Sequence, residues 1–483
     1  MHGPPWRRGT RAMSATLPAV EVHASPEVRP GAVLAVVSSA AFLASLDLFI
    51  VNVAFEHLGR SFQGVSLADL SWVLNGYAIT YAALLIPLGR LADRFGRKAG
   101  FLLGLGLFTA ASAACAASTG LWSLVLSRIA QAAGAALLTP TSLGLLLNAT
   151  PPEGRTRAVR IWAAVGSLAA AAGPVAGGLL VELSWQWVFL VNLPVGIVAL
   201  IAAARIIPDS REAVHGPLPD LLGAGLLGIA VGALSLALDK AQEWGWSDGR
   251  TGVSLLVSIV AGGLFWWRSS GHPAPVIEPA LLRVRTFAWA NLGVFLFSVA
   301  FAASLLTGIL WMQQVWHYAG LRTGLAVSPG PLMVPVFATV AQRLSRRVGA
   351  GWLAAAGCVF CAAGALHSMM RVGAEPDYLT GMLPGWLLTG IGVGLAIPTL
   401  LASATVDLPP ARSATGSAII NMSRQVGMAL GVSLLVALVG GSVGGALRAA
   451  FGHVWMAAAV VALCAAPLCL GLNTSRIRTP SSA

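Results

Sequence analysis

The chain has 483 residues, of which 57% are hydrophobic and only 10% are charged, and its mean hydropathy is +0.79. A soluble domain normally carries about 25% charged residues, so this composition excludes a soluble enzyme. The net charge of +12 does not indicate nucleic-acid binding, because the basic residues lie in short clusters between apolar runs. Such clusters are typical of the orientation signals of membrane proteins.

Fourteen apolar runs follow one another along the chain, each about as long as a membrane-spanning helix. Helices are predicted because backbone groups in lipid need partners within their own segment, and because the runs lack the alternation of a barrel strand. The predicted spans are 31–55, 70–89, 99–118, 122–148, 158–181, 188–207, 221–239, 252–268, 287–310, 323–342, 351–370, 380–402, 413–440 and 452–472.

The loops between the spans carry a strong charge bias. With the N-terminus in the cytoplasm, 22 basic residues fall on the cytoplasmic side and 6 on the outer side. Lys and Arg concentrate in the cytoplasmic loops of membrane proteins, and one missed helix would reverse every later loop. We therefore expect a multi-pass protein of the cell inner (cytoplasmic) membrane with both termini cytoplasmic.

Two parts of the chain repeat each other at long range. The series Gly134, Pro140, Thr141, Pro151 and Pro152 recurs 258 residues later as Gly392, Pro398, Thr399, Pro409 and Pro410. A parallel repeat of this kind predicts two related helical bundles with a binding site between them near the membrane midplane. The predicted domains are a disordered cytoplasmic tail (1–30), an N-terminal six-helix bundle (31–207), two inserted helices (208–270), a C-terminal six-helix bundle (287–472) and a second cytoplasmic tail (473–483).

The loop after the second predicted span has the sequence GRLADRFGRK, residues 89–98. Its glycines, Gly89 and Gly96, permit a tight turn between closely packed helices. Asp93 is expected to cap a helix or to pair with an arginine, Arg94 or Arg97. Such a charged latch breaks when two bundles rock against each other, so a cytoplasmic gating loop is predicted here; a loop that only sets orientation is the alternative.

Three charges fall well inside predicted spans. Asp47 is the one carboxylate, and Arg128 and Arg424 are the bases. A charge at the centre of a helix costs about 2.5–3.5 kcal/mol on insertion scales, so each is a functional candidate. Asp47 and Arg128 are expected at comparable depths in one bundle, as a proton-coupling pair or as a structural ion pair. The amides near these charges are candidates to line a polar cavity, namely Asn52, Gln131, Asn421 and Gln425.

The span 158–181 has a face of small residues. Ala169, Gly173 and Gly177 recur every fourth position, so they share one helix face where a neighbouring helix can approach closely. Pro174 adds a bend. A packing role alone explains this face as well as a transport role does.

Taken together, these motifs resemble the fourteen-helix drug:proton antiporter family of the major facilitator superfamily. The loop 89–98 matches the signature of the superfamily. The matching family segments are LDLFIVNVA (46–54), RIAQAAGAA (128–136), Gly166 followed by GPVAGG (173–178), WQWVFLVNLPVG (185–196) and NMSRQVG (421–427). The resemblance implies the major facilitator fold, and it implies that Gly166, Gly173, Pro174, Gly177 and Gly178 form the antiporter helix that limits leakage.

The function implied by the resemblance is proton-coupled export of small amphipathic molecules such as drugs or antibiotics. Metabolite uptake or uniport by the same fold, and a membrane sensor without transport, are the alternatives. An ATP-driven pump is excluded, because neither lysine of the chain, Lys98 or Lys240, follows a glycine as a Walker A loop requires. We expect a monomer whose partners are substrate, protons and the lipid bilayer, with no cofactor, no metal and no nucleic acid.

Overall fold

The computed structural model describes residues 30–62, 64–208, 217–345 and 347–472, and these residues form helices with no strand. Except for Pro30, the two predicted tails lie outside the described residues. The first group of helices is α1 (Pro30–Ser61), α2 (Leu67–Phe95), α3 (Arg97–Ala116), α4 (Leu121–Ala149), α5 (Pro152–Leu183), α6 (Trp187–Leu190) and α7 (Asn192–Ile206).

A hairpin of two helices follows, α8 (Leu221–Trp244) and α9 (Gly249–Gly271). The second group is α10 (Pro279–Leu282), α11 (Arg285–Gln314), α12 (Gly320–Val327), α13 (Pro329–Leu344), α14 (Ala350–Arg371), the π-helical turn η1 (Tyr378–Met382), α15 (Leu383–Val406), α16 (Pro410–Val439) and α17 (Gly444–Leu470).

These elements make fourteen candidate membrane spans within the described residues, which confirms the predicted fold class. Three spans combine two elements each: α6 with α7, α12 with α13, and η1 with α15. A proline stands at the first position of α13 and at the second position of α15, where its missing N–H costs least.

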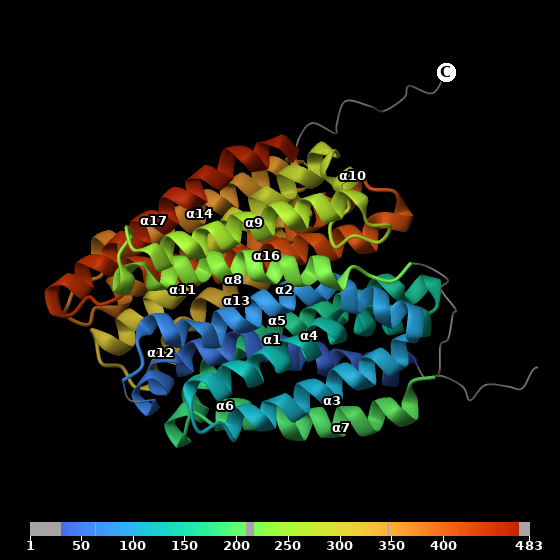
Figure 1. The fold of residues 1–483 in the computed structure, drawn as a ribbon, viewed down its shortest axis with the longest axis horizontal. Helices are drawn as coiled ribbons and strands as arrows, with labels where there is room; N and C mark the ends of the chain where they lie inside the picture. The colour runs from blue at the N-terminus through green and yellow to red at the C-terminus, as the bar shows by residue number, and fades with distance from the viewer. Residues whose placement is uncertain (1–29, 63, 209–216, 346, 473–483) are drawn as a thin grey trace, which may run out of the picture.

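Fourteen spans return the chain to the side of the membrane where it started. We call the side where α1 begins and α17 ends the terminal side, and the opposite side the distal side. In Figure 1, the first group of helices (blue through teal to green) lies below the second group (yellow to red), and α8 of the light green hairpin runs along the junction between them. The hairpin helix α8 packs against α2 of the first group and α16 of the second. It therefore covers the seam where these two helices meet.

The opposite seam, between α5 and the span α12–α13, is closed on the distal side only. A Cβ atom built on Gly178 of α5 would lie 2.3 Å from the carbonyl oxygen of Gly320 of α12. Toward the terminal side the same helices are open, with Leu168 64% exposed and Val336 53% exposed. The described conformation thus has its two groups of helices in contact at the distal end.

Candidate functional site

The two charges predicted inside the first group form a buried ion pair. Asp47 of α1 is 0% exposed and Arg128 of α4 is 1% exposed, and Arg128 donates a hydrogen bond of 2.5 Å to the Asp47 carboxylate. The Arg128 guanidinium also lies 4.1 Å from the ring centroid of Tyr77. A buried ion pair is stable only when its remaining polar atoms have partners.

Neutral side chains supply these partners. Gln131 and Asn192 each donate to Asp47 Oδ1, at 2.8 Å and 3.1 Å, and Gln131 also accepts from Arg128 at 2.6 Å. Ser112 of α3 lies within hydrogen-bond distance of both amides. Sequence reasoning quoted the segment that contains Asn192 but gave this residue no role, and it missed Ser112. The pair is thereby fixed by α1, α3, α4 and α7, all from one group.

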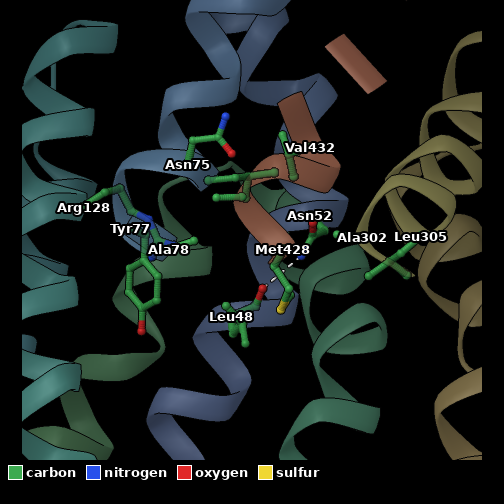
Figure 2. Close-up of a pocket in the computed structure, with 12 residues that line it drawn as sticks. Leu48, Asn52, Asn75, Tyr77, Ala78, Arg128, Ala302, Leu305, Met428 and Val432 are labelled. Carbon is green, nitrogen blue, oxygen red and sulfur yellow. Dashed lines mark hydrogen bonds between the residues drawn. The ribbon is translucent and has the colours of Figure 1, made fainter. Parts of the chain in front are cut away.

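A small cavity of about 30 Å³ lies beside this ion pair, between the two groups of helices. Its wall is contributed by α1, α2, α4, α11 and α16 (Figure 2) and is made of Leu48, Asn52, Leu74, Asn75, Tyr77, Ala78, Arg128, Ala302, Leu305, Met428, Ala429 and Val432. Arg128 is the charged member of the described wall, so it faces the cavity while it holds Asp47. This volume is far below the roughly 300–1,000 Å³ of pockets that hold drug-sized ligands, so a drug-sized molecule fits only after the groups move apart.

Of the residues predicted to line a polar cavity, only Asn52 belongs to the wall of the cavity described here. Asn52 lines the cavity, and Gln131 belongs to the ion-pair network instead. On α16, Asn421 bonds to the backbone of its own helix, and Arg424 Nε and Gln425 Oε1 are buried without hydrogen-bond partners among the described residues. These three residues do not line this cavity in the described conformation.

The tight turn predicted between Gly89 and Gly96 is made at Gly96 alone. Gly96 has a φ of 111° between α2 and α3, which only glycine adopts easily. Gly89 lies inside α2, where its Cβ position is 3.2 Å from Pro140 of α4, so the prediction of a turn there was wrong. Asp93 of α2 pairs with Arg97 of α3 at 2.6 Å, across the turn at Gly96.

Next to this loop, a connecting segment ties two helices together at the terminal side. Arg90 of α2 donates to Glu278 at 3.1 Å and to the Pro275 carbonyl at 2.7 Å. Arg412 of α16 lies 3.7 Å from the other oxygen of Glu278. Sequence reasoning assigned no role to Glu278, which lies just after the inserted hairpin.

The small-residue face of α5 contacts α1. Cβ atoms built on Gly173 and Gly177 would lie 2.8 Å from Phe49 Cβ and 2.7 Å from the Ile50 carbonyl oxygen. Gly166 is looser, at 3.3 Å from Ser45. A second face of α5 meets α12: Gly178 faces Gly320, and the Pro174 carbonyl oxygen would lie 2.2 Å from a Cβ on Gly324. Glycine thus permits close approach both within the first group and between the groups.

Sequence reasoning missed a carboxylate that is buried within a helix. The predicted span 221–239 ends at Asp239, but α8 continues to Trp244, and Asp239 is 1% exposed. The helix continues because the next residue, Lys240, is neutralised by Asp69 at 2.9 Å and by Glu243 at 2.6 Å. A second acid therefore lies inside the described helices, in the inserted hairpin.

Fourteen candidate spans in two groups around an interior cavity, with a buried ion pair in its wall, are typical of a polytopic membrane transporter. The family model described as Major Facilitator Superfamily matches residues 37–432. The chain belongs to the Major Facilitator Superfamily.

Curated relatives cover most of the chain. It is 31% identical to the Methylenomycin A resistance protein of Streptomyces coelicolor, over 84% of this chain and 85% of the relative. It is 35% identical to the Cephamycin export protein CmcT of Amycolatopsis lactamdurans, over 83% of each chain. The Tetracenomycin C resistance and export protein of Streptomyces glaucescens is 32% identical, over 83% of this chain and 74% of the relative.

Solved structures show the same fold. A crystal structure of the peptide transporter POT in complex with sulfate superposes with a TM-score of 0.66, covers 91% of this chain and 95% of its own, and is 18% identical. The human organic anion transporter MFSD10 (TETRAN) gives a TM-score of 0.60 at 16% identity, over 92% of this chain and 100% of its own.

Proposed function

We propose that this chain is a proton-coupled exporter of small amphipathic molecules, such as drugs or antibiotics, that works by alternating access. The observation that carries the proposal is the buried Asp47–Arg128 ion pair, in which Arg128 also lines the cavity. Relatives at 31–35% identity are named as resistance and export proteins, which favours export over uptake. The proposed organisation is two six-helix bundles joined by the α8–α9 hairpin, in a monomer in the inner membrane.

Orientation follows from the charge bias of the loops. The terminal side, with both termini, is proposed to face the cytoplasm and the distal side to face outward. The described conformation then has its outer end closed and the α5 seam open toward the cytoplasm. In alternating access such a state precedes loading, because the cavity must widen before a drug-sized molecule enters it.

Proton coupling is proposed to act through the partner choice of Arg128. While Asp47 is ionised it holds the guanidinium, as described here. A proton on Asp47 removes that attraction and leaves Arg128 able to bind an acceptor group in the cavity. Proton and substrate thus change the same contact, and each proton moved inward contributes about 2.3 kcal/mol per 100 mV.

The test uses purified protein in liposomes with an imposed pH gradient and a panel of neutral and charged amphipathic compounds. We expect substrate movement against its gradient, coupled to proton movement and abolished by a protonophore. Asp47→Asn is expected to bind substrate but to lose gradient-driven transport, and Glu375→Gln, an exposed acid in a loop, serves as the matched control.

Two results would contradict the proposal. Gradient-driven transport by Asp47→Asn at the wild-type rate would remove Asp47 from the coupling step. Facilitated transport that ignores the pH gradient in the wild type would indicate a uniporter.

A further inference from the structure

Asp239 lies where the inserted hairpin touches α2 of the first group and α16 of the second, near the distal side. It precedes the end of α8 by five residues, or about 7.5 Å of helix. Ser71 and Asn75 of α2 are within 2.8 Å and 3.2 Å of Asp239 Oδ2, and Asn75 also donates to Ser433 of α16 at 3.1 Å. All four side chains are fully buried or nearly so. We call these four residues the distal cluster.

The hydrogen bonds of Ser71 bear on whether the Asp239 carboxyl group carries a proton. Its hydroxyl oxygen is 2.7 Å from the Ala68 carbonyl and 2.8 Å from Asp239 Oδ2. A hydroxyl has one proton to donate, and a carbonyl oxygen accepts only. When Ser71 donates to Ala68, the contact with Asp239 is a hydrogen bond only if Asp239 carries a proton and donates it to Ser71.

The charges around the cluster leave Asp239 without a direct ion pair among the described residues. Lys240 on the same helix is bonded to Asp69 of α2 and to Glu243. On α9, Arg250 stacks on the ring of Trp244 at 6.0 Å, and Asp248 caps the start of that helix. On α16, Arg424 precedes Ser433 by nine residues, about 13 Å of helix. Asp239 Oδ1 is buried without a partner among the described residues.

Closing the distal end is therefore linked to the charge of Asp239. Burying an ionised carboxylate without a counter-ion is far more costly than burying a neutral acid with a hydrogen-bond partner. The cluster joins α2, α8 and α16, and Gln242 adds a bond of 2.8 Å to the Ala437 carbonyl of α16. When α2 and α16 separate at the distal end, water reaches the carboxylate.

We propose that Asp239 controls closure of the distal side by binding a proton, and we call this residue the clasp. When Asp239 takes up a proton from the distal side, α2, α8 and α16 can close over its neutral side chain. This site is separate from the Asp47–Arg128 pair and does not depend on the role proposed for that pair. The clasp would make the inserted hairpin part of the conformational change during transport. Asn75 lines the cavity as well as the cluster, so the distal cluster and the cavity share a side chain.

The test measures the distal distance directly, without substrate or transport. Spin labels at Ser61→Cys of α1 and Arg448→Cys of α17, both exposed, report the separation of the bundles by pulsed electron resonance. The background is Cys464→Ala, because the other four native cysteines are buried. If closing takes up one proton, the ratio of distally open to distally closed protein is expected to rise by up to about tenfold for each unit by which the pH is raised.

Matched variants assign the pH response to one residue. Asp239→Asn, a permanently neutral side chain, is expected to stay closed between about pH 5 and about pH 9. Glu243→Gln, a partly exposed acid on the same helix, is expected to keep the wild-type response. A wild-type distance that ignores pH, or an Asp239→Asn distance that still follows it, would overturn the proposal.

A second variant keeps the test decisive if Asp239→Asn fails to fold. Ser71→Ala removes the acceptor for the Asp239 proton, so the closed state then needs a lower pH and the midpoint shifts downward. If Ser71 instead donates to an ionised Asp239, the same substitution shifts the midpoint upward. An upward shift or an unchanged midpoint would therefore refute the clasp.

Discussion

At the scale of single residues, the Asp47–Arg128 pair shows how a charge is kept inside a membrane bundle. The carboxylate accepts from Arg128, Gln131 and Asn192, and the guanidinium also donates to the Val73 carbonyl. Every one of these partners belongs to the first group of helices. The network is therefore a structural element of that group of helices, in addition to the proton-coupling role proposed for it.

The first prediction separates these two roles. Arg128→Gln leaves the buried Asp47 charge without its partner, which is expected to cost about 3–5 kcal/mol and to reduce the yield of folded protein. Adding Asp47→Asn removes the charge and should restore the melting temperature, measured by size-exclusion chromatography after heating. Proton-driven transport is expected to stay absent in the double variant. A double variant as unstable as Arg128→Gln would show that charge pairing does not hold this network together.

At the scale of elements, α5 uses two glycine faces for two different contacts. Gly173 and Gly177 allow α1 to approach within the first group, whereas Gly178 faces Gly320 of the second group. Contacts within a bundle persist through alternating access, while contacts between bundles form and break. The two faces are therefore expected to respond differently to substitution.

The second prediction follows from this difference. Gly173→Leu and Gly177→Leu are expected to impair folding, because overpacking costs about 1–3 kcal/mol or more. Gly324→Val, which would meet the Pro174 carbonyl oxygen, should fold but hold the distal side open. An Asn52→Cys reporter in the cavity wall should then react at least about tenfold faster with a membrane-impermeant maleimide added outside.

The matched control is Gly452→Val on α17, because nothing lies within 4 Å of a Cβ built there. This variant should leave folding and reporter labelling as in the wild type. Labelling of the Gly324→Val protein at the wild-type rate would mean that the α5–α12 contact does not seal the distal side.

At the scale of the whole molecule, the described cavity wall is apolar with two amides, Asn52 and Asn75, and one positive charge, Arg128. The spans of the second group contain no buried acid among the described residues. The third prediction is that neutral or weakly acidic amphipathic compounds compete for transport at least about tenfold better than dications of similar size, a difference of about 1.4 kcal/mol. Competition assays in vesicles measure this ranking, and a dication as the best competitor would contradict it.

Much of this architecture can be predicted from the sequence, because lipid requires helices and leaves long apolar runs as their signal. All fourteen spans were found in this way. The ends of the helices were less certain. The helix α2 continues to Phe95 through the charged residues Arg90, Asp93 and Arg94, and α8 continues past Asp239. Both helices extend beyond their apolar runs because paired charges remain helical. Hydropathy therefore overlooked Asp239. It also gave no means to tell that Asn52 lines the cavity and that Asn421 does not, since that depends on how the bundles face each other.

The position of the α8–α9 hairpin makes the two flanks of the molecule unlike. On one flank α8 packs over the meeting line of α2 and α16 with a small apolar core of Ala78, Ile79, Val231 and Ala429. On the other flank the terminal halves of α5 and α13 carry exposed apolar side chains such as Leu168 and Val336. An amphipathic compound in the surrounding lipid therefore meets the hairpin on one flank and the exposed apolar side chains of α5 and α13 on the other. If the terminal side faces the cytoplasm as proposed, we expect compounds dissolved in the inner leaflet to enter beside α5 and α13 rather than beside α8.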